Sequence, residues 1–183
     1  RHNIISIKRG YEVGSKYYGK GSIPFVRTTD LSNWEITYNP YKAIPFEIYQ
    51  KYKKLLDIRE NDILLVTDGT FLIGTTAIVT KYDTEIVIQS HIRRIRCLKP
   101  EMLHPYILLY LLNTEFVQDQ IKNKTIVQST ISTIGNRIYD IILPIPKDSE
   151  TIENIYSIVK DIIEKKLEIR KTISNLPDIT KVG

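Results

Sequence analysis

The chain has 183 residues, 42% of them hydrophobic, and a formal net charge of +5. This length supports one hydrophobic core and is too short for two ordinary domains with linkers, while no apolar run reaches the roughly 18 residues of a membrane span. Because the chain has a single cysteine, Cys97, a disulfide framework and a cysteine-rich zinc site are excluded. Cys97 is expected to be a small buried hydrophobe, which fits a reducing cytoplasm.

The first third of the chain predicts two strands, a loop and a helix. Residues 4–10 read as a short strand that ends at a glycine. A loop rich in glycine, tyrosine and lysine covers 14–21, and a second strand over 23–28 leads into a turn at 30–34. Residues 45–56 have the apolar spacing of an amphipathic helix.

The centre of the chain predicts a strand, a tight turn and a returning strand. Residues 63–67 form a short apolar run bounded by turn residues, which is typical of a buried strand. Asp68-Gly69 follows directly and is a strong hairpin-turn signal. Residues 71–80 are therefore expected to return beside the buried strand.

Strands and one helix are predicted over the next sixty residues. Residues 86–89 and 92–98 have strand character, 105–121 predict a helix with Pro105 in its first turn, and 138–143 predict a final strand. The expected fold class is α+β, with a mixed, mostly antiparallel sheet followed by a long C-terminal helix of the coiled-coil type.

The last part of the chain predicts that helix. Asp148 and Ser149 suit its N-terminus, and Pro177 ends it. Apolar residues recur at alternating steps of three and four, with Lys166 in the one missing slot. The helix could lie on its own domain, but the length of its seam favours an arm that pairs with another helix. The predicted interface residues are Ile152, Ile155, Val159, Ile162, Ile169, Ile173 and Leu176.

Two parts follow from this pattern: a globular part over residues 1–147 and a helical part over 148–183. Residues 1–146 contain 19 Lys and Arg against 14 Asp and Glu, whereas residues 147–183 contain 7 of each. All the excess positive charge therefore lies in the globular part, which favours a polyanion such as nucleic acid as its partner.

Catalytic patterns are missing from the sequence. The three histidines, His2, His91 and His104, are scattered without a second ligand at metal spacing, and His104 before a proline reads as a helix start. A histidine of this kind is structural more often than catalytic. We therefore expect no metal site.

Motifs for base methylation and DNA cleavage are also incomplete. Residues 39–41 (Asn-Pro-Tyr) lack the second proline of the motif that holds a flipped base, and 19–21 lack the strand–turn–helix context of a cofactor-binding turn. A Pro-Asp pair at 177–178 has no acidic-x-Lys triplet after it. The sequence thus predicts a module that is not itself an enzyme and holds no cofactor of its own.

Loop 14–21 is the first candidate for binding DNA. Lys16 and Lys20 can neutralise phosphates, Tyr17 and Tyr18 offer hydroxyl groups and flat rings, and the glycines allow a close approach of the main chain. An ordinary surface loop is the alternative.

Further candidates are polar or basic side chains near strand ends and turns. Arginine reads guanine edges and threonine contacts phosphates or methyl groups. Each could instead serve locally as a salt-bridged strand end, a turn former or a partner of acidic neighbours; of the three arginines over 93–96, two should share one face of their strand and at least one should pack on acids. The candidates are Arg27, Thr28, Thr67, Asp68, Thr70, His91, Arg93, Arg94, Gln128, Ser129 and Thr130.

Several segments, in order and spacing, resemble one family. Residues 21–31 (GSIPFVRTTDL) are similar to the "IPFVRTSDI" segment of target-recognition domains in type I restriction-modification specificity subunits. Residues 61–77 resemble the "GDILLvrdG…iG" segment of the same domains, 105–112 the helix that follows, and 131–146 the closing "is…lPlP" run. Similar domains end some single-chain methyltransferase-nucleases.

The resemblance implies a function. Such domains read one part of a split target in double-stranded DNA, and their helices act as spacers that dock methyltransferase subunits. S-adenosylmethionine and the chemistry then belong to the methyltransferase partner, and restriction subunits are further partners. A whole specificity subunit has two recognition domains and two helices, whereas this chain has one of each. We therefore expect either a half-subunit that forms a homodimer, with the helix contacting the second copy, or a piece of a longer chain.

Three alternatives stay open on the sequence alone. The chain could be the recognition fragment of a single-chain methyltransferase-nuclease, a dimerising scaffold without DNA affinity, or an RNA binder, although it lacks the aromatic sheet motif of that last class.

Overall fold

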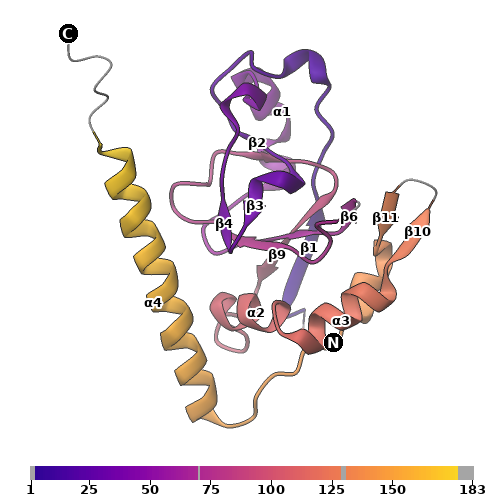
Figure 1. Ribbon diagram of the computed structural model, residues 1–183, viewed down its shortest axis with the longest axis vertical. Helices are drawn as coiled ribbons and strands as arrows, with labels where there is room; N and C mark the ends of the chain where they lie inside the picture. Colours follow the sequence, from indigo (N-terminus) through magenta and orange to yellow (C-terminus); the bar gives the residue numbers. More distant parts are fainter. Residues whose placement is uncertain (1–2, 70, 129–130, 177–183) are drawn as a thin grey trace. The chain divides into compact units, whose positions relative to one another are not determined.

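A computed structural model describes residues 3–69, 71–128 and 131–176 of the chain. By their internal contacts the residues divide into two units, Arg1–Ile145 and Pro146–Gly183, which are described separately. The fold is α+β, mostly antiparallel, with a long C-terminal helix, as the sequence predicts (Figure 1).

A four-stranded antiparallel sheet forms the centre of the first unit. Its order is β1 (Ile5–Arg9), β9 (Ile92–Cys97), β5 (Ile63–Val66) and β7 (Thr76–Ile78). The strand predicted over 63–67 is therefore confirmed, and all four residues of β5 are buried. The strands predicted over 4–10 and 92–98 pair along their whole length as β1 and β9.

Both faces of this sheet are covered, which explains the unbroken apolar run of β5. Leu64 and Val66 point into the main hydrophobic core, together with Ile92. Side chains alternate along a strand, so Ile63 and Leu65 point the other way. On that side Leu65 lines a small apolar hollow with side chains of the helix α2 (Pro105–Leu112).

Shorter elements build the main core beside the first face. Strand β2 (Phe25–Val26) pairs in parallel with β8 (Val87–Ile88), and α1 (Phe46–Leu56) follows Pro45 as predicted. The turn predicted over 30–34 is a tight hairpin between β3 (Leu31–Ser32) and β4 (Glu35–Ile36). Its two central residues have positive φ, as a two-residue hairpin turn requires.

The prediction that Asp68-Gly69 forms a hairpin turn is wrong. These residues form strand β6 (Asp68–Gly69), which pairs with β11 (Ile131–Thr133) and not with its chain neighbours. The chain turns back only around 72–75, where Gly74 has a φ of +94° and donates to the carbonyl of Val66, so the returning strand is the short β7. A distant strand thus competes successfully with the local turn preference.

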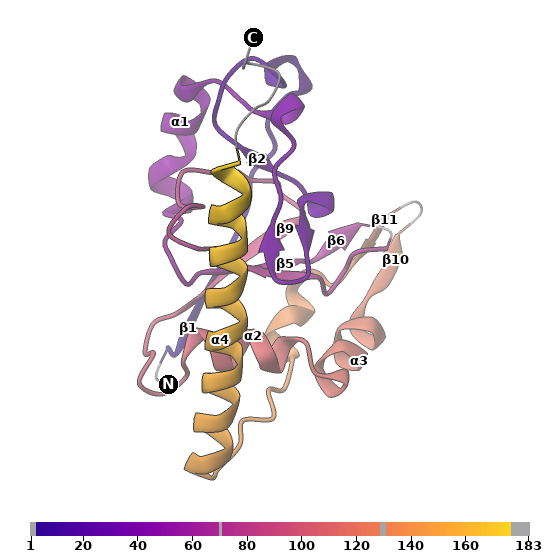
Figure 2. The ribbon, with the colours of Figure 1, turned by 60° about the vertical axis from the view of Figure 1, so that its left-hand side comes forward.

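The single helix predicted over 105–121 is two helices. Helix α2 ends at Leu112, and α3 (Glu115–Lys124) begins after Thr114, which has extended backbone angles. The side chain of Asn113 donates to the carbonyl of Leu109 and to the hydroxyl of Thr76 on β7. These bonds hold the interruption against the sheet. In Figures 1 and 2, α2 and α3 lie at one end of this unit and α1 at the other.

The final strand predicted over 138–143 is also wrong. Residues Gly135–Asp140 form a 3-10 helix, whose Ile138 is buried, and the chain then runs on without a ladder partner. The last strands lie earlier, where β10 (Ile126–Gln128) pairs antiparallel with β11.

The second unit contains one uninterrupted helix, α4 (Ser149–Ser174), as Figure 2 shows. Asp148 caps it as expected, because its carboxylate accepts from the backbone N–H of Thr151 at 2.7 Å. That bond lowers the pKa of Asp148. Among the described residues, no helix combines the length and apolarity needed to cross a membrane.

Candidate nucleic-acid interface

Loop 14–21 is built by its main chain and anchored on the segment 41–45. Ser15–Tyr17 forms a single 3-10 turn, and Gly19 takes a φ of +68° while its N–H donates to the carbonyl of Ala43 at 2.8 Å. Ile23 and Ile44 bridge just beyond. The loop therefore has a defined conformation, with Lys16 and Lys20 exposed on it.

The two loop tyrosines each lie under a lysine. The ammonium of Lys16 lies 5.0 Å from the ring centre of Tyr17, and that of Lys42 lies 5.0 Å from the ring of Tyr18. Tyr18 also packs on Phe25, at 5.6 Å between ring centres. Lys42 was not among the sequence candidates, because it is 24 residues away from its ring and no local pattern links them.

Arg27 is held by the carboxylate of Asp30. Its guanidinium reaches Asp30 at 3.3 Å, and its backbone N–H donates to the same carboxylate at 2.8 Å. Asp30 is buried, whereas the Arg27 side chain is 25% exposed and its Nε is buried without a partner. The structure therefore contains the salt-bridged strand end that the sequence analysis gave as the alternative. The ion pair orients Arg27 beside the half-buried Thr28.

Glu12 connects several of these residues into one group, which we name the Glu12 cluster. Glu12 accepts from the hydroxyl of Ser90 and lies 3.9 Å from Nε2 of His91. Burial raises the pKa of Tyr18, Glu12 raises it further, and Arg27 lowers it. The Glu12 cluster consists of Glu12, Tyr18, Arg27, Ser90 and His91.

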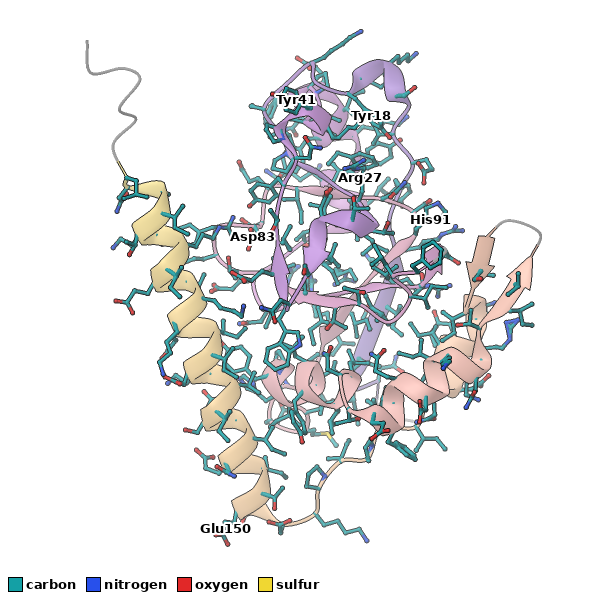
Figure 3. The ribbon with its side chains drawn as sticks, viewed as in Figure 1. Tyr18, Arg27, Tyr41, Asp83, His91 and Glu150 are labelled. Carbon is teal, nitrogen blue, oxygen red and sulfur yellow. The ribbon has the colours of Figure 1, made fainter. Side chains whose placement is uncertain are left out.

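Figure 3 shows Tyr18, Arg27 and His91 along one side of the first unit, with Asp83 on another. Three candidates from separate stretches of sequence are thus brought together. Sequence reasoning missed Glu12 and Ser90, since an isolated acid and an isolated serine carry no signal until the chain folds. The cluster combines an aromatic hydroxyl, an arginine and an imidazole, groups that can donate hydrogen bonds to a phosphate or a base.

Thr67 and Asp68 are excluded from direct contact with DNA by their burial. Their side chains are 0% and 8% exposed. The hydroxyl of Thr67 donates to Asp68 at 3.1 Å, and the hydroxyl of Thr133 donates to Asp68 from β11. The expectation that they probe a groove is therefore corrected: they join β6 to β11.

Arg94 is likewise corrected, because it belongs to the interior. It is 1% exposed and lies 3.6 Å from Asp62, which is also 1% exposed. Burial lowers the pKa of Arg94, and the neighbouring Asp62 raises it. Arg96 shares its face, bonding Asp62 at 2.7 Å and Asp57 at 2.8 Å. The expectations that two of the three arginines share one face, and that at least one packs on acids, are confirmed.

Arg93 points to the opposite face and stays a candidate. It is half-buried, and its buried Nε has no hydrogen-bond partner among the described residues. Gln128 ends β10, while Thr70, Ser129 and Thr130 lie outside the described residues.

The other groups considered for chemistry are potential metal ligands, Cys97 and His104. Within the described ranges, no three His, Cys, Asp or Glu side chains gather as metal ligands. Burial raises the pKa of Cys97 to about 12, which keeps it a thiol. His104 caps α2 as predicted, with Nδ1 accepting from Tyr106 N–H at 3.1 Å, and burial lowers its pKa.

Comparisons with known proteins found one matching family and similar solved structures. Residues 3–176 match the family described as "Type I restriction modification DNA specificity domain". The crystal structure of the S subunit of a type I restriction-modification system from M. genitalium is similar, with a TM-score of 0.60 and 13% identity over 92% of this chain and 38% of that one. A chain from a structure on complex assembly and conformational transition of the type I R-M system has a TM-score of 0.57 and 16% identity over 93% and 38%.

At these identities the two structures bear on the fold alone. The chain spans 38% of the length of each. No curated protein matches it.

Proposed function

Because the chain belongs to the type I restriction modification DNA specificity domain family, we propose that its first unit binds double-stranded DNA and recognises a target sequence. The family match over residues 3–176 carries this proposal. The excess of positive charge in residues 1–146 supports it, because DNA affinity rests largely on neutralising phosphates.

The proposed contacts divide by chemistry. Lys16, Lys20 and Lys42 anchor the unit on phosphates, since the first two are exposed and all three lie on or beside loop 14–21. Arg27, oriented by Asp30, reaches base edges or the backbone together with its neighbour Thr28. Tyr17, Tyr18, His91 and Arg93 complete this interface, and Thr70, Gln128, Ser129 and Thr130 remain sequence-based candidates for it.

The partners follow from the same family. We assign residues 1–147 to DNA recognition and 148–183 to a spacer helix that docks a methyltransferase subunit or a second recognition domain. The methyltransferase would bind S-adenosylmethionine and carry out the chemistry, while this chain supplies specificity without catalysing a reaction, and restriction subunits would join the same complex. A recognition fragment of a single-chain methyltransferase-nuclease would use the same interface.

The proposal is tested by selecting bound sequences from a library of random duplexes with the full chain. An enriched motif is expected, and Arg27→Ala should relax preference at one base position by about 1–3 kcal/mol. The double variant Lys16→Ala with Lys20→Ala should weaken binding to all duplex sequences alike. Each lost phosphate contact should flatten the salt dependence of log K by about 0.9.

Lys81→Ala is the matched control for Lys16→Ala. Lys81 is also exposed and lies over its neighbour's ring, 5.2 Å from Tyr82, but sits in the loop that contains Asp83, on another side in Figure 3. It should leave affinity and salt slope unchanged. Absence of duplex binding at low ionic strength, both alone and with its methyltransferase, would refute the proposed function.

A further inference from the structure

Two arginines face each other across the edge of the central sheet. Arg9 on β1 is registered directly opposite Arg93 on β9. Directly opposed residues in an antiparallel pair share a face, with Cβ atoms about 4.5–5.5 Å apart, and two like charges there destabilise the sheet. We name these residues the arginine pair.

The two other arginines of these strands have an acidic partner. On the opposite face, Arg94 and Arg96 both reach Asp62, at 3.6 and 2.7 Å. Lys8, opposite Arg94, donates to the carbonyl of Leu55 at 3.2 Å. Asp62 thus supplies negative charge beside Arg94 and Arg96 on that face.

No acid meets the arginine pair among the residues that the structure describes. Within the part of the chain that the structure describes, Arg9 bonds through its Nε, which donates to the carbonyl of Ser90 at 2.8 Å. Within residues 3–69, 71–128 and 131–176, no hydrogen bond or ion pair meets the side chain of Arg93, and its Nε is buried. The nearby carboxylates are engaged elsewhere: Glu12 with Ser90 and His91, and Asp68 with the hydroxyls of Thr67 and Thr133.

An external anion would remove this repulsion. Guanidinium groups present planar forks of N–H donors that match the oxygens of a phosphate. Arg9 is exposed and Arg93 is half-buried, so the pair can accept such a group from solvent. Through Ser90 the pair adjoins the Glu12 cluster and extends the interface already described.

We propose that Arg9 and Arg93 together bind one phosphate group of the DNA backbone. This inference rests on the proposed function for the source of the phosphate, and on the sheet register for the site itself. Arg9 thereby becomes a binding residue that sequence reasoning did not select.

The experiment has two arms on the full chain. In the first, thermal unfolding is followed in sodium phosphate and in sodium chloride of equal ionic strength. Phosphate should raise the melting temperature of the wild type above its value in chloride, partly through its general stabilising effect on folded proteins. Arg9→Gln or Arg93→Gln should make this difference smaller than in the wild type. Arg59→Gln is the control, because Arg59 is exposed and paired with Asp57 at 2.9 Å.

The second arm measures affinity for a random duplex over a range of salt concentrations. Arg9→Gln should flatten the dependence of log K on log salt by about 0.9, with the enriched sequence motif unchanged and with Arg59→Gln without effect. Arg9 is exposed, so this variant keeps the test valid even if Arg93→Gln unfolds.

The outcomes separate the two proposals. A phosphate effect as large in Arg9→Gln as in the wild type overturns the site, as does an unchanged salt slope in a protein that otherwise binds duplex. A smaller phosphate effect in the variants, in a chain that ignores every duplex, supports an anion site fed by free phosphate and overturns its assignment to DNA.

Discussion

Asp62 illustrates how single residues divide the arginines of this protein between folding and binding. It neutralises Arg94 and Arg96 and also accepts the backbone N–H of Arg59. Removing one partner of a buried charge pair leaves the other without compensation. Arg94 and Arg96 therefore have an acidic partner, whereas no acid among the described residues pairs with Arg9 or Arg93.

The first prediction concerns this buried pair. Asp62→Asn should lower the free energy of unfolding by about 3 kcal/mol or more, because Arg94 is left buried without its counter-charge. Arg59→Ala, which removes an exposed ion pair, should cost less than about 1 kcal/mol. Urea denaturation measures both. Equal losses in the two variants would contradict the role assigned to Asp62.

The second prediction concerns acid stability and Asp57. Hydrogen bonds from Arg96 and then Arg59 lower the pKa of Asp57 from 3.8 to about 2. A carboxylate with a lowered pKa stabilises the fold above its unfolded pKa, and this contribution is lost as pH falls from 3.8 towards 2.

Asp57→Asn is the variant that tests this, because Asp57 has a φ of +48° and asparagine tolerates that region well. It should be less stable than the wild type at neutral pH, and the difference should shrink across that acid window. Urea unfolding at several pH values checks it, and a difference independent of pH would rule out the assignment.

Helix ends belong to the next scale, that of elements. His104 caps α2 through an imidazole nitrogen that accepts the N–H of Tyr106, so the cap requires the neutral ring. Burial lowers the pKa of His104 below 6.5. A histidine with a lowered pKa contributes stability above its unfolded pKa and loses it as pH falls below that value.

The third prediction follows. His104→Asn keeps an N-cap that accepts a backbone hydrogen bond but does not titrate. When the pH is lowered from above 6.5 to below it, the melting temperature of the wild type should fall more than that of the variant. Parallel curves would show that the cap has no part in the pH dependence.

Elements also show where local patterns mislead. The apolar period of residues 105–121 continues through a break at which Asn113 bonds Thr76 on the distant strand β7. Likewise, Asp68-Gly69 has the composition of a turn, yet its partner in the ladder is β11. Both errors arise because the competing partner is far away in sequence.

At the scale of the whole molecule, the seam of α4 bears on assembly. Ile169 and Ile173 are 59% and 62% exposed, and they continue the heptad spacing of the helix. We predict that replacing both with Asp converts a self-associating chain into a monomer, or abolishes binding of the methyltransferase subunit. Analytical ultracentrifugation, with and without that subunit, measures the change.

Ile158→Asp is the matched control for the seam. Ile158 is 53% exposed on the same helix but is not one of the apolar residues that form the heptad seam. It should leave the assembly state unchanged. If it disrupts association as strongly as the seam variant, general exposed hydrophobicity and not the seam holds the complex together.

The sequence by itself determined what depends on near neighbours: the buried run of β5, the separate strands β1 and β9, the caps at His104 and Asp148, and the long helix α4. Side-chain periodicity and capping act over a few residues, and they can be read directly from the chain. The family resemblance added the function class, which the match over residues 3–176 supports.

Only the tertiary structure decided which polar residues reach the surface. Arg93 and Arg94 are adjacent and chemically identical. Arg94 nevertheless meets Asp62 in the interior, whereas Arg93 lies opposite Arg9 of the edge strand β1. Thr67 and Asp68 are buried by a strand about 65 residues further on. Such outcomes depend on pairing between distant segments, whose free energy comes from burial and hydrogen bonds that no local pattern records.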